Sequence, residues 1–165
     1  MMYQAAASRK LDRIDRKILT ELQHNADISN LELAERVGLS ASPCARRVKL
    51  LEEAGIIKKR VTLLDQTALG LDLTIYVHVC LECQIPERLE NFERKVMNYD
   101  EVMECSLITG SDADFLLKVV MPDMAYYEHF LLKELNRIEG VTSIRTSFAL
   151  RTVVKKTAFK LRGAG

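Results

Sequence analysis

No stretch of this chain is apolar over the roughly 20 residues that a membrane-spanning helix requires. Its first ten residues, MMYQAAASRK, also lack an apolar core of the length found in signal peptides. The composition is otherwise ordinary for a soluble globular protein, with 48% hydrophobic and 28% charged residues. We therefore expect a cytoplasmic protein that has no membrane partner.

Residues that could build a metal or catalytic centre are few and scattered. Cys80 and Cys83 form a lone Cys-x-x-Cys inside a strand-like run, where positions three apart face opposite sides. No second cysteine or histidine pair has the spacing to complete a zinc site, so the cysteines are interpreted as small hydrophobic residues. His24, His78 and His129 fall on three separate predicted elements. We expect no metal site, no catalytic residues, no cofactor and no enzyme activity.

The net charge is small but unevenly distributed along the chain. The formal total is +1, whereas residues 36–60 contain seven Lys and Arg side chains against two Glu. The remainder of the chain is correspondingly acidic. A local basic segment on a nearly neutral protein indicates a confined contact with an anionic partner.

The segment from Leu33 to Ile57 has the pattern of a helix-turn-helix, with two short amphipathic helices joined by a glycine turn. Apolar residues at helical spacing predict a preceding helix, which Asp12 can cap. Ser29 can cap the second helix, and Gly38 can end it in a left-handed conformation. The third helix starts just before Pro43, because proline is tolerated only in the first turn of a helix.

The solvent face of this third helix carries cations, which is typical of a recognition helix that enters the major groove of DNA. We predict that Arg46 and Lys49 contact base edges or the groove. Short strands at 56–57 and 61–64, on either side of a basic segment, predict a wing after the helix. The other predicted DNA contacts, which set register on phosphates or mark the helix start, are Ser40, Ser42, Pro43, Arg47, Lys58, Lys59 and Arg60. An ordinary solvated helix face is the alternative interpretation of these cations.

The second half of the chain has a different rhythm. Apolar and polar residues alternate from Leu73 to Glu82, which predicts a strand covered on one side. A helix, two strands, a second helix and a last strand follow, and this order predicts a ferredoxin-like βαββαβ domain. The further elements expected are a helix from Pro86, strands at 102–109, 115–120 and 141–150, and a helix from Asp123 to Glu139.

These patterns predict an α+β protein with an N-terminal winged helix-turn-helix and a C-terminal ferredoxin-like domain. The expected boundaries are 11–64 for the DNA-binding domain, 65–72 for a linker, 73–157 for the second domain, and 1–10 and 158–165 for tails. One face of the sheet is left open by its helices, so we expect a two-fold dimer through that face. Two recognition helices would then reach half-sites about one turn of DNA apart.

The sequence resembles the Lrp/AsnC family, the leucine-responsive and asparagine-synthesis regulators of bacteria and archaea. The resemblance covers about residues 11–157. In the first half it is carried by LDRID at 11–15, LAERVGLS at 33–40 and SPCARRVK at 42–49. In the second half it is carried by the loop from Thr109 to Asp114, by MPDM at 121–124 and by Gly140-Val141.

The resemblance implies a winged DNA-binding domain joined to a domain that assembles dimers, often into octamers. It also implies that an amino acid or related small acid binds between dimers at an effector loop. That loop corresponds here to Thr109, Gly110, Asp112 and Asp114. An aspartate would bind the ammonium group of the ligand, and the glycine would admit its carboxylate to backbone N–H groups. Thr146 and Ser147 are further candidates for this site; alternatively, the aspartates only cap a hairpin turn.

The leading hypothesis is a sequence-specific DNA-binding transcription regulator that an amino acid or related small metabolite modulates. An enzyme is the first alternative, because a branch with a similar two-domain plan acts as sirohaem decarboxylases, which would need a basic or histidine-bearing pocket. A protein-interaction adaptor that does not bind DNA is the second. Salt-sensitive binding to duplex DNA separates the regulator from the adaptor, and an absorption shift on adding sirohaem would identify the enzyme.

Overall fold

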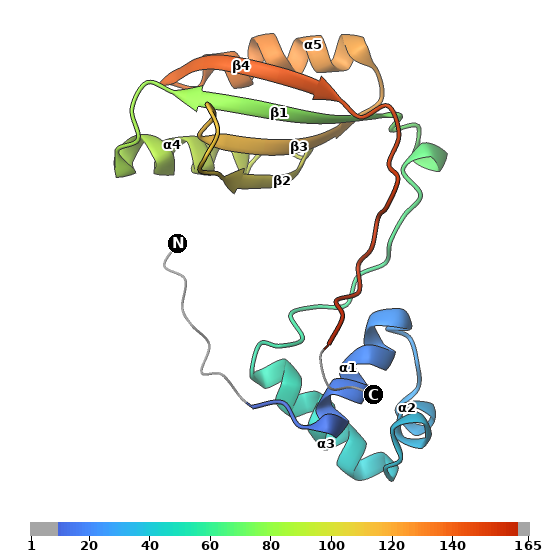
Figure 1. Ribbon diagram of the computed structural model, residues 1–165. Coiled ribbons are helices and arrows are strands. Elements are labelled where there is room, and N and C mark those ends of the chain that lie inside the picture. The colour runs from blue at the N-terminus through green and yellow to red at the C-terminus, as the bar shows by residue number, and fades with distance from the viewer. Residues whose placement is uncertain (1–9, 162–165) are drawn as a thin grey trace. The chain divides into compact units, whose positions relative to one another are not determined.

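The computed structural model describes residues 10–161, and the chain divides into two units (Figure 1). Three helices form the first unit. They are α1 (Arg13–His24), α2 (Asn30–Val37) and α3 (Ala41–Glu53). Each helix turns its apolar side inward, as the 3.6-residue period predicts. The resulting core consists of Ile18, Leu19, Ile28, Leu33, Ala34, Val37, Cys44 and Leu51.

The ends of these helices follow local chemistry. The Asp12 side chain caps α1, and the Ser29 hydroxyl accepts a hydrogen bond from the backbone N–H of Glu32 at the start of α2. Gly38 ends α2 with φ of 76°, a left-handed conformation in which its N–H bonds back to the helix. Pro43 lies in the first turn of α3. The expected helix-turn-helix is therefore present.

The wing strands expected at 56–57 and 61–64 are absent: the structure describes all of these residues, and none of them lies in a strand. Val61 and Leu63 are exposed at 57% and 66%. A two-stranded hairpin is marginal in water without a surface to pack on. Residues 58–60 therefore belong to an extended segment rather than a hairpin.

The end of the chain returns to the first unit, which comprises residues 1–63 and 154–165. The side chain of Gln23 bonds twice to the backbone of Phe159: its Nε2 donates to the carbonyl oxygen at 3.2 Å, and its Oε1 accepts from the N–H at 2.7 Å. Leu161 packs on the three-helix core. The expected boundary at 157 therefore differs from the division seen in the structure, which follows Val153, because these contacts hold residues 158–161.

The second unit is a four-stranded antiparallel sheet with strand order β2-β3-β1-β4, covered by two helices. The elements are β1 (Leu73–Leu81), α4 (Pro86–Val96), β2 (Val102–Leu107), β3 (Phe115–Met121), α5 (Met124–Lys133) and β4 (Val141–Phe148). This is the predicted βαββαβ order. A 3₁₀ helix at Thr67–Leu69 precedes it, inside the segment expected to be a linker.

One face of this sheet holds the core of the second unit. Ile75, Val77 and Val79 on β1 are fully buried against side chains of both helices, among them Phe92 of α4 and Phe130 of α5. The alternate residues of β1, such as Tyr76 and His78, lie on the face that neither helix covers. None of the described helices is long and apolar enough to cross a membrane.

The last helix is shorter than predicted. The pattern predicted one helix to Glu139, but α5 ends at Lys133 and a 3₁₀ turn covers Leu135–Arg137. Side chains three residues apart are aligned in 3₁₀ geometry. The change of helix type thus lets both Leu135 and Ile138 enter the core.

Candidate nucleic-acid interface and ligand-binding loop

The two sides of α3 differ sharply in character. Cys44 and Leu51 are completely buried in the three-helix core. Ser42, Arg46 and Lys49 are exposed on the other side of the helix. The same spacing that sends the apolar residues inward thus holds two cations and a hydroxyl outward. Pro43 is also exposed, at the start of this surface.

Arg46 is the least engaged cation of this surface. No hydrogen bond or ion pair of its guanidinium is present within residues 10–161. Lys49 Nζ lies 3.7 Å from Glu53 Oε1, one helical turn away, and both side chains are mostly exposed. Exposed pairs of this kind contribute little, so Lys49 is also available to a stronger anion.

Arg47, the next residue, lies in another environment. Its Nη1 donates to Asp12 Oδ2 at 2.6 Å and to Asp15 Oδ1 at 2.8 Å. Asp15 is almost fully buried, and the Arg47 side chain is 28% exposed. Its hydrogen bonds to Asp12 and Asp15 raise the pKa of the Arg47 guanidinium. The group predicted to hold a phosphate is thus already bound to two carboxylates.

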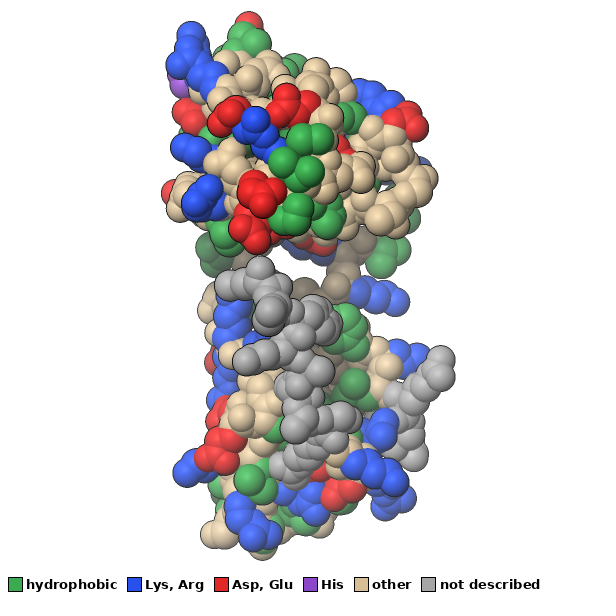
Figure 2. Space-filling model, turned by 90° about the vertical axis from the view of Figure 1, so that its left-hand side faces the viewer, with side chains coloured by type: hydrophobic (Ala, Val, Ile, Leu, Met, Phe, Trp, Pro, Cys, Tyr) green, Lys and Arg blue, Asp and Glu red, His purple; other side chains and the backbone are tan. Residues whose placement is uncertain are grey.

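The remaining predicted DNA contacts lie at the two ends of α3. Ser40 is the N-cap residue, and its exposed side chain makes no capping hydrogen bond. Lys58 and Lys59 are exposed beyond the C-terminal end. Arg60 Nη2 lies 3.3 Å from Glu52 Oε1. Lys and Arg side chains project from several places on this unit in Figure 2.

In the second unit, the loop between β2 and β3 contains the predicted effector residues. Thr109, Gly110 and Asp112 are exposed, and Gly110 has φ of 83°, which L side chains rarely adopt. Asp112 Oδ2 pairs with Arg145 Nη1 of β4 at 3.0 Å, and its side chain is 85% exposed. The carbonyl oxygen of Asp112 also accepts a hydrogen bond from Cys80 Sγ.

Asp114 differs from Asp112 although the two are only two residues apart. It is 8% exposed, and both of its carboxylate oxygens are engaged. Oδ2 accepts from the backbone N–H of Leu81 at 2.7 Å, and Oδ1 accepts from Gln84 Nε2 at 2.5 Å. Asp114 thus ties the β2–β3 loop to the end of β1.

Thr146 and Ser147 do not converge on this loop together. Thr146 pairs with Val77 in the sheet and its hydroxyl bonds to Tyr127 of α5, on the helix-covered side. Ser147 pairs with Tyr76 and is exposed on the opposite face. Neighbouring residues of a strand point to opposite faces, so a single site on one face takes only one of them.

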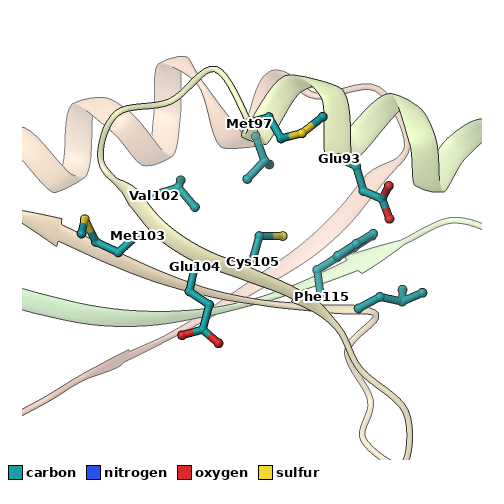
Figure 3. Close-up of a pocket in the computed structure, with 9 residues that line it drawn as sticks. Glu93, Met97, Val102, Met103, Glu104, Cys105 and Phe115 are labelled. Atoms are coloured by element: carbon teal, nitrogen blue, oxygen red, sulfur yellow. The ribbon is translucent and has the colours of Figure 1, made fainter. Parts of the chain in front are cut away.

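A pocket of about 400 Å³, which the sequence did not reveal, lies between α4 and the edge strand β2. Figure 3 shows Met97, the residue after the end of α4, on one side of it and Val102 and Cys105 of β2 on the other. Leu107 and Phe115, the last residue of β2 and the first of β3, also line it. The pocket therefore reaches both strand ends that the β2–β3 loop connects. In the sequence these residues were indistinguishable from ordinary core positions.

Within the described part of the chain, no three or more His, Cys, Asp and Glu side chains are grouped so that they could hold a metal ion. The four cysteines are all free. Two surfaces offer groups for hydrogen bonding and charge pairing: the exposed side of α3 and the β2–β3 loop.

Comparisons with known proteins assign the two units, each of which carries one of these surfaces, to the two domains of one protein family. Residues 11–58 match the model for winged helix-turn-helix DNA-binding domains, and residues 74–159 match the Lrp/AsnC ligand binding domain. The Leucine-responsive regulatory protein of Rhizobium meliloti (strain 1021) is 43% identical over 144 residues, which cover 87% of this chain and 92% of that protein. The protein of the same name from Escherichia coli (strain K12) is 43% identical over 143 residues, 87% of each chain.

Solved structures agree with this assignment. A transcriptional regulator from Neisseria meningitidis, in complex with L-Met, superimposes with a TM-score of 0.88 at 37% identity, covering 93% of this chain and 98% of that one. An AsnC family transcriptional regulator from Agrobacterium tumefaciens gives 0.86 at 36% identity, with coverage of 91% and 97%. The chain belongs to the Lrp/AsnC family of DNA-binding transcription regulators, with a winged helix-turn-helix ahead of a ligand-binding domain.

Proposed function

We propose that this regulator reads its operator with the exposed side of α3. We also propose that an amino acid or related small metabolite, bound at the β2–β3 loop, changes its affinity for DNA. The observation that carries the first half is the Arg46 guanidinium, exposed on the recognition helix and unpaired within residues 10–161. An arginine in this position can bind both acceptors of a guanine edge in the major groove.

Each of the other contacts has a role in this proposal. Lys49 lies in the groove beside Arg46, with Pro43 at the entering end of the helix. Ser40 and Ser42 bind a phosphate at the α3 N-terminus, where helix dipole and free N–H groups favour anions. Lys58, Lys59 and Arg60 bind phosphates past the other end of the helix, which sets register without reading sequence.

For the ligand, we propose that Asp112 binds the ammonium group and that Thr109 and the backbone at Gly110 bind the carboxylate. The exposure of Asp112 and the left-handed backbone at Gly110 support this arrangement. The L-Met complex of the Neisseria meningitidis regulator supports the class of ligand. Asp114 shapes the loop through its two internal hydrogen bonds. Of Thr146 and Ser147, Ser147 is the better candidate because it is exposed, whereas the Thr146 hydroxyl is bonded to Tyr127.

We further propose that the protein acts as a dimer, and as an octamer built from four dimers, in the cytoplasm and without catalysis. The face of the sheet opposite the helices supports the dimer, since Tyr76 there is 38% exposed and neither helix covers it. A closed two-fold assembly would present two copies of α3 to one duplex.

The experiment first selects genomic DNA fragments that the protein binds, with and without each amino acid, and then measures affinity on the selected duplex and a scrambled one. If each dimer neutralises six to eight phosphates, affinity falls about 10³- to 10⁵-fold between 50 and 200 mM salt. Arg46→Ala should cost about 1–3 kcal/mol on the selected duplex and less on the scrambled one. Arg94→Ala, which removes an exposed arginine of α4, is the matched control and should change neither affinity.

Three results would each contradict part of the proposal. Equal losses on both duplexes would assign Arg46 to phosphate binding instead of base reading. An absence of salt-sensitive duplex binding by the wild-type protein would remove the DNA-binding function altogether. Selection that no amino acid alters would remove the proposed effector.

A further inference from the structure

We propose that Arg47 is a positioning residue for the recognition helix: it locks α3 to the capping box of α1 and does not bind DNA phosphate. The inference rests on the proposed reading of DNA by α3. It concerns a residue one position after Arg46 in the sequence whose guanidinium meets quite different partners.

The start of α1 is a reciprocal cap made of two aspartates. Asp12 Oδ1 accepts from the backbone N–H of Asp15 at 2.7 Å, and Asp15 Oδ2 faces the backbone N–H of Asp12 at 3.4 Å. In each aspartate one oxygen thus serves the backbone of α1. The second oxygen of each, Asp12 Oδ2 and Asp15 Oδ1, lies against the same nitrogen of Arg47. Arg47 therefore completes a cap that belongs to another helix.

The charges make this contact more than a surface pair. Two carboxylates occupy one helical turn, and the Asp15 side chain is only 2% exposed. The Asp12 side chain is half exposed. A buried carboxylate such as that of Asp15 is costly without a positive partner, and a second carboxylate nearby adds repulsion. Arg47 brings a positive charge into contact with both carboxylates. The Asp12–Arg47 and Asp15–Arg47 contacts join residues that lie 35 and 32 positions apart.

The geometry of α3 links this lock to DNA reading. Successive residues of a helix are about 100° apart around its axis, so fixing Arg47 on the α1 side fixes the direction of Arg46. Cys44 and Leu51 hold the same helix by apolar packing, which is less directional. A hydrogen bond from Asn30 Nδ2 of α2 to the Ala41 carbonyl oxygen, at 2.9 Å, holds the start of α3. Arg47 supplies the polar contact to α1, which sets the rotation of α3 further along and with it the direction of Arg46 and Lys49.

The experiment compares full-length variants on the selected and scrambled duplexes across a salt series. Arg47→Met keeps the apolar stem and removes the charge, and Asp12→Ser keeps an N-cap oxygen but removes the contact to Nη1. Arg13→Met, which removes an exposed cation of α1, is the matched control for charge. Measurements are made at a temperature at which circular dichroism shows every variant to be as helical as the wild type.

We expect Arg47→Met and Asp12→Ser to reduce the ratio of selected to scrambled affinity about tenfold, as loss of one base contact does, with an unchanged salt slope. Arg47→Lys should restore much of the ratio, because a single nitrogen makes both contacts. Arg13→Met should leave the ratio unchanged.

A phosphate-binding Arg47 would give the opposite pattern: a salt slope lower by about 1 per site, an unchanged ratio, and tighter binding by Asp12→Ser. That pattern overturns this inference while leaving the proposed function intact; loss of wild-type DNA binding would overturn the proposed function itself.

Discussion

Asp12 and Asp15 each divide their two carboxylate oxygens between α1 and Arg47. The backbone N–H of Asp15 is the main cause that lowers the pKa of Asp12 below its ordinary value of 3.8, and Arg47 lowers it further. A carboxyl group whose pKa is lowered by folding stabilises the protein in its ionised form. That contribution is present above the unfolded pKa and is lost as the pH falls through the folded one.

This gives a prediction for pH dependence. Asp12→Asn keeps a side chain that caps helices well but has no charge. The variant should be less stable than the wild type at pH 6, and the difference should shrink as the pH falls below about 4. Urea unfolding followed by circular dichroism between pH 2.5 and 6 measures this. A difference that stays constant over the whole range would mean that the charge of Asp12 contributes nothing.

Asp112 and Asp114 illustrate the limit of sequence at the scale of single residues. Both were predicted to contact the effector, and nothing in their spacing distinguishes them. Burial and partners do: Asp112 is exposed, whereas both oxygens of Asp114 are bonded to Leu81 and Gln84. Arg47 is the same kind of case in the first unit. Hydrogen bonds that span 30 or more residues have no local signature in the sequence.

At the scale of elements, the turn between α2 and α3 depends on Gly38. Its φ of 76° lies in the left-handed region, and an added Cβ would meet nothing within 4 Å. The need for glycine there is thus a matter of backbone conformation alone, without any steric contact. The periodic pattern predicted this turn and the three helices around it because the causes are local.

We predict that Gly38→Ala lowers the free energy of unfolding by about 1 kcal/mol through backbone strain. Gly38→Asn should cost clearly less, because asparagine tolerates the left-handed region. Urea denaturation of both variants checks the order. Equal stability of the alanine variant and the wild type would show that the turn relaxes to another conformation.

Elements whose form depends on distant packing were predicted less well. The wing strands needed burial against a surface, and Val61 and Leu63 remain mostly exposed at 57% and 66%. The end of α5 depends on how Leu135 and Ile138 enter the core of the second unit, and a 3₁₀ turn achieves this. The strands β1 and β3 were located well. The alternation of apolar and polar residues in β1 is visible in the sequence, and β3 is a short, nearly continuous apolar run that follows a turn.

At the scale of the whole molecule, the last described residues are part of the DNA-binding unit. The Gln23 side chain bonds to both the N–H and the carbonyl oxygen of Phe159, and Leu161 packs on the three-helix core. The chain therefore enters this unit twice, up to Leu63 and again from Val154. Two covalent segments therefore connect the second unit to the unit that contains the recognition helix.

Leu161→Ala should therefore destabilise the first unit by about 1 kcal/mol, the cost of partly exposing its apolar surface. Amide hydrogen exchange of α1 and α2 should become about fivefold faster, while that of β1 and β3 should be unchanged. Lys160→Ala, one residue away and exposed, is the control and should alter neither. Unchanged exchange in α1 would show that the segment lies on the unit without stabilising it.

By itself, the sequence determined the three amphipathic helices, the order βαββαβ of the elements along the second unit, the basic face of α3 and the family. These follow from periodicity, capping residues and short motifs, all of which act within a few residues of the chain. Only the tertiary structure decided which cations and carboxylates are exposed. Arg46 is exposed and Arg47 is bound to two aspartates, and Asp112 is exposed while Asp114 is buried. The physical reason is that burial and charge pairing depend on partners brought together from distant parts of the chain.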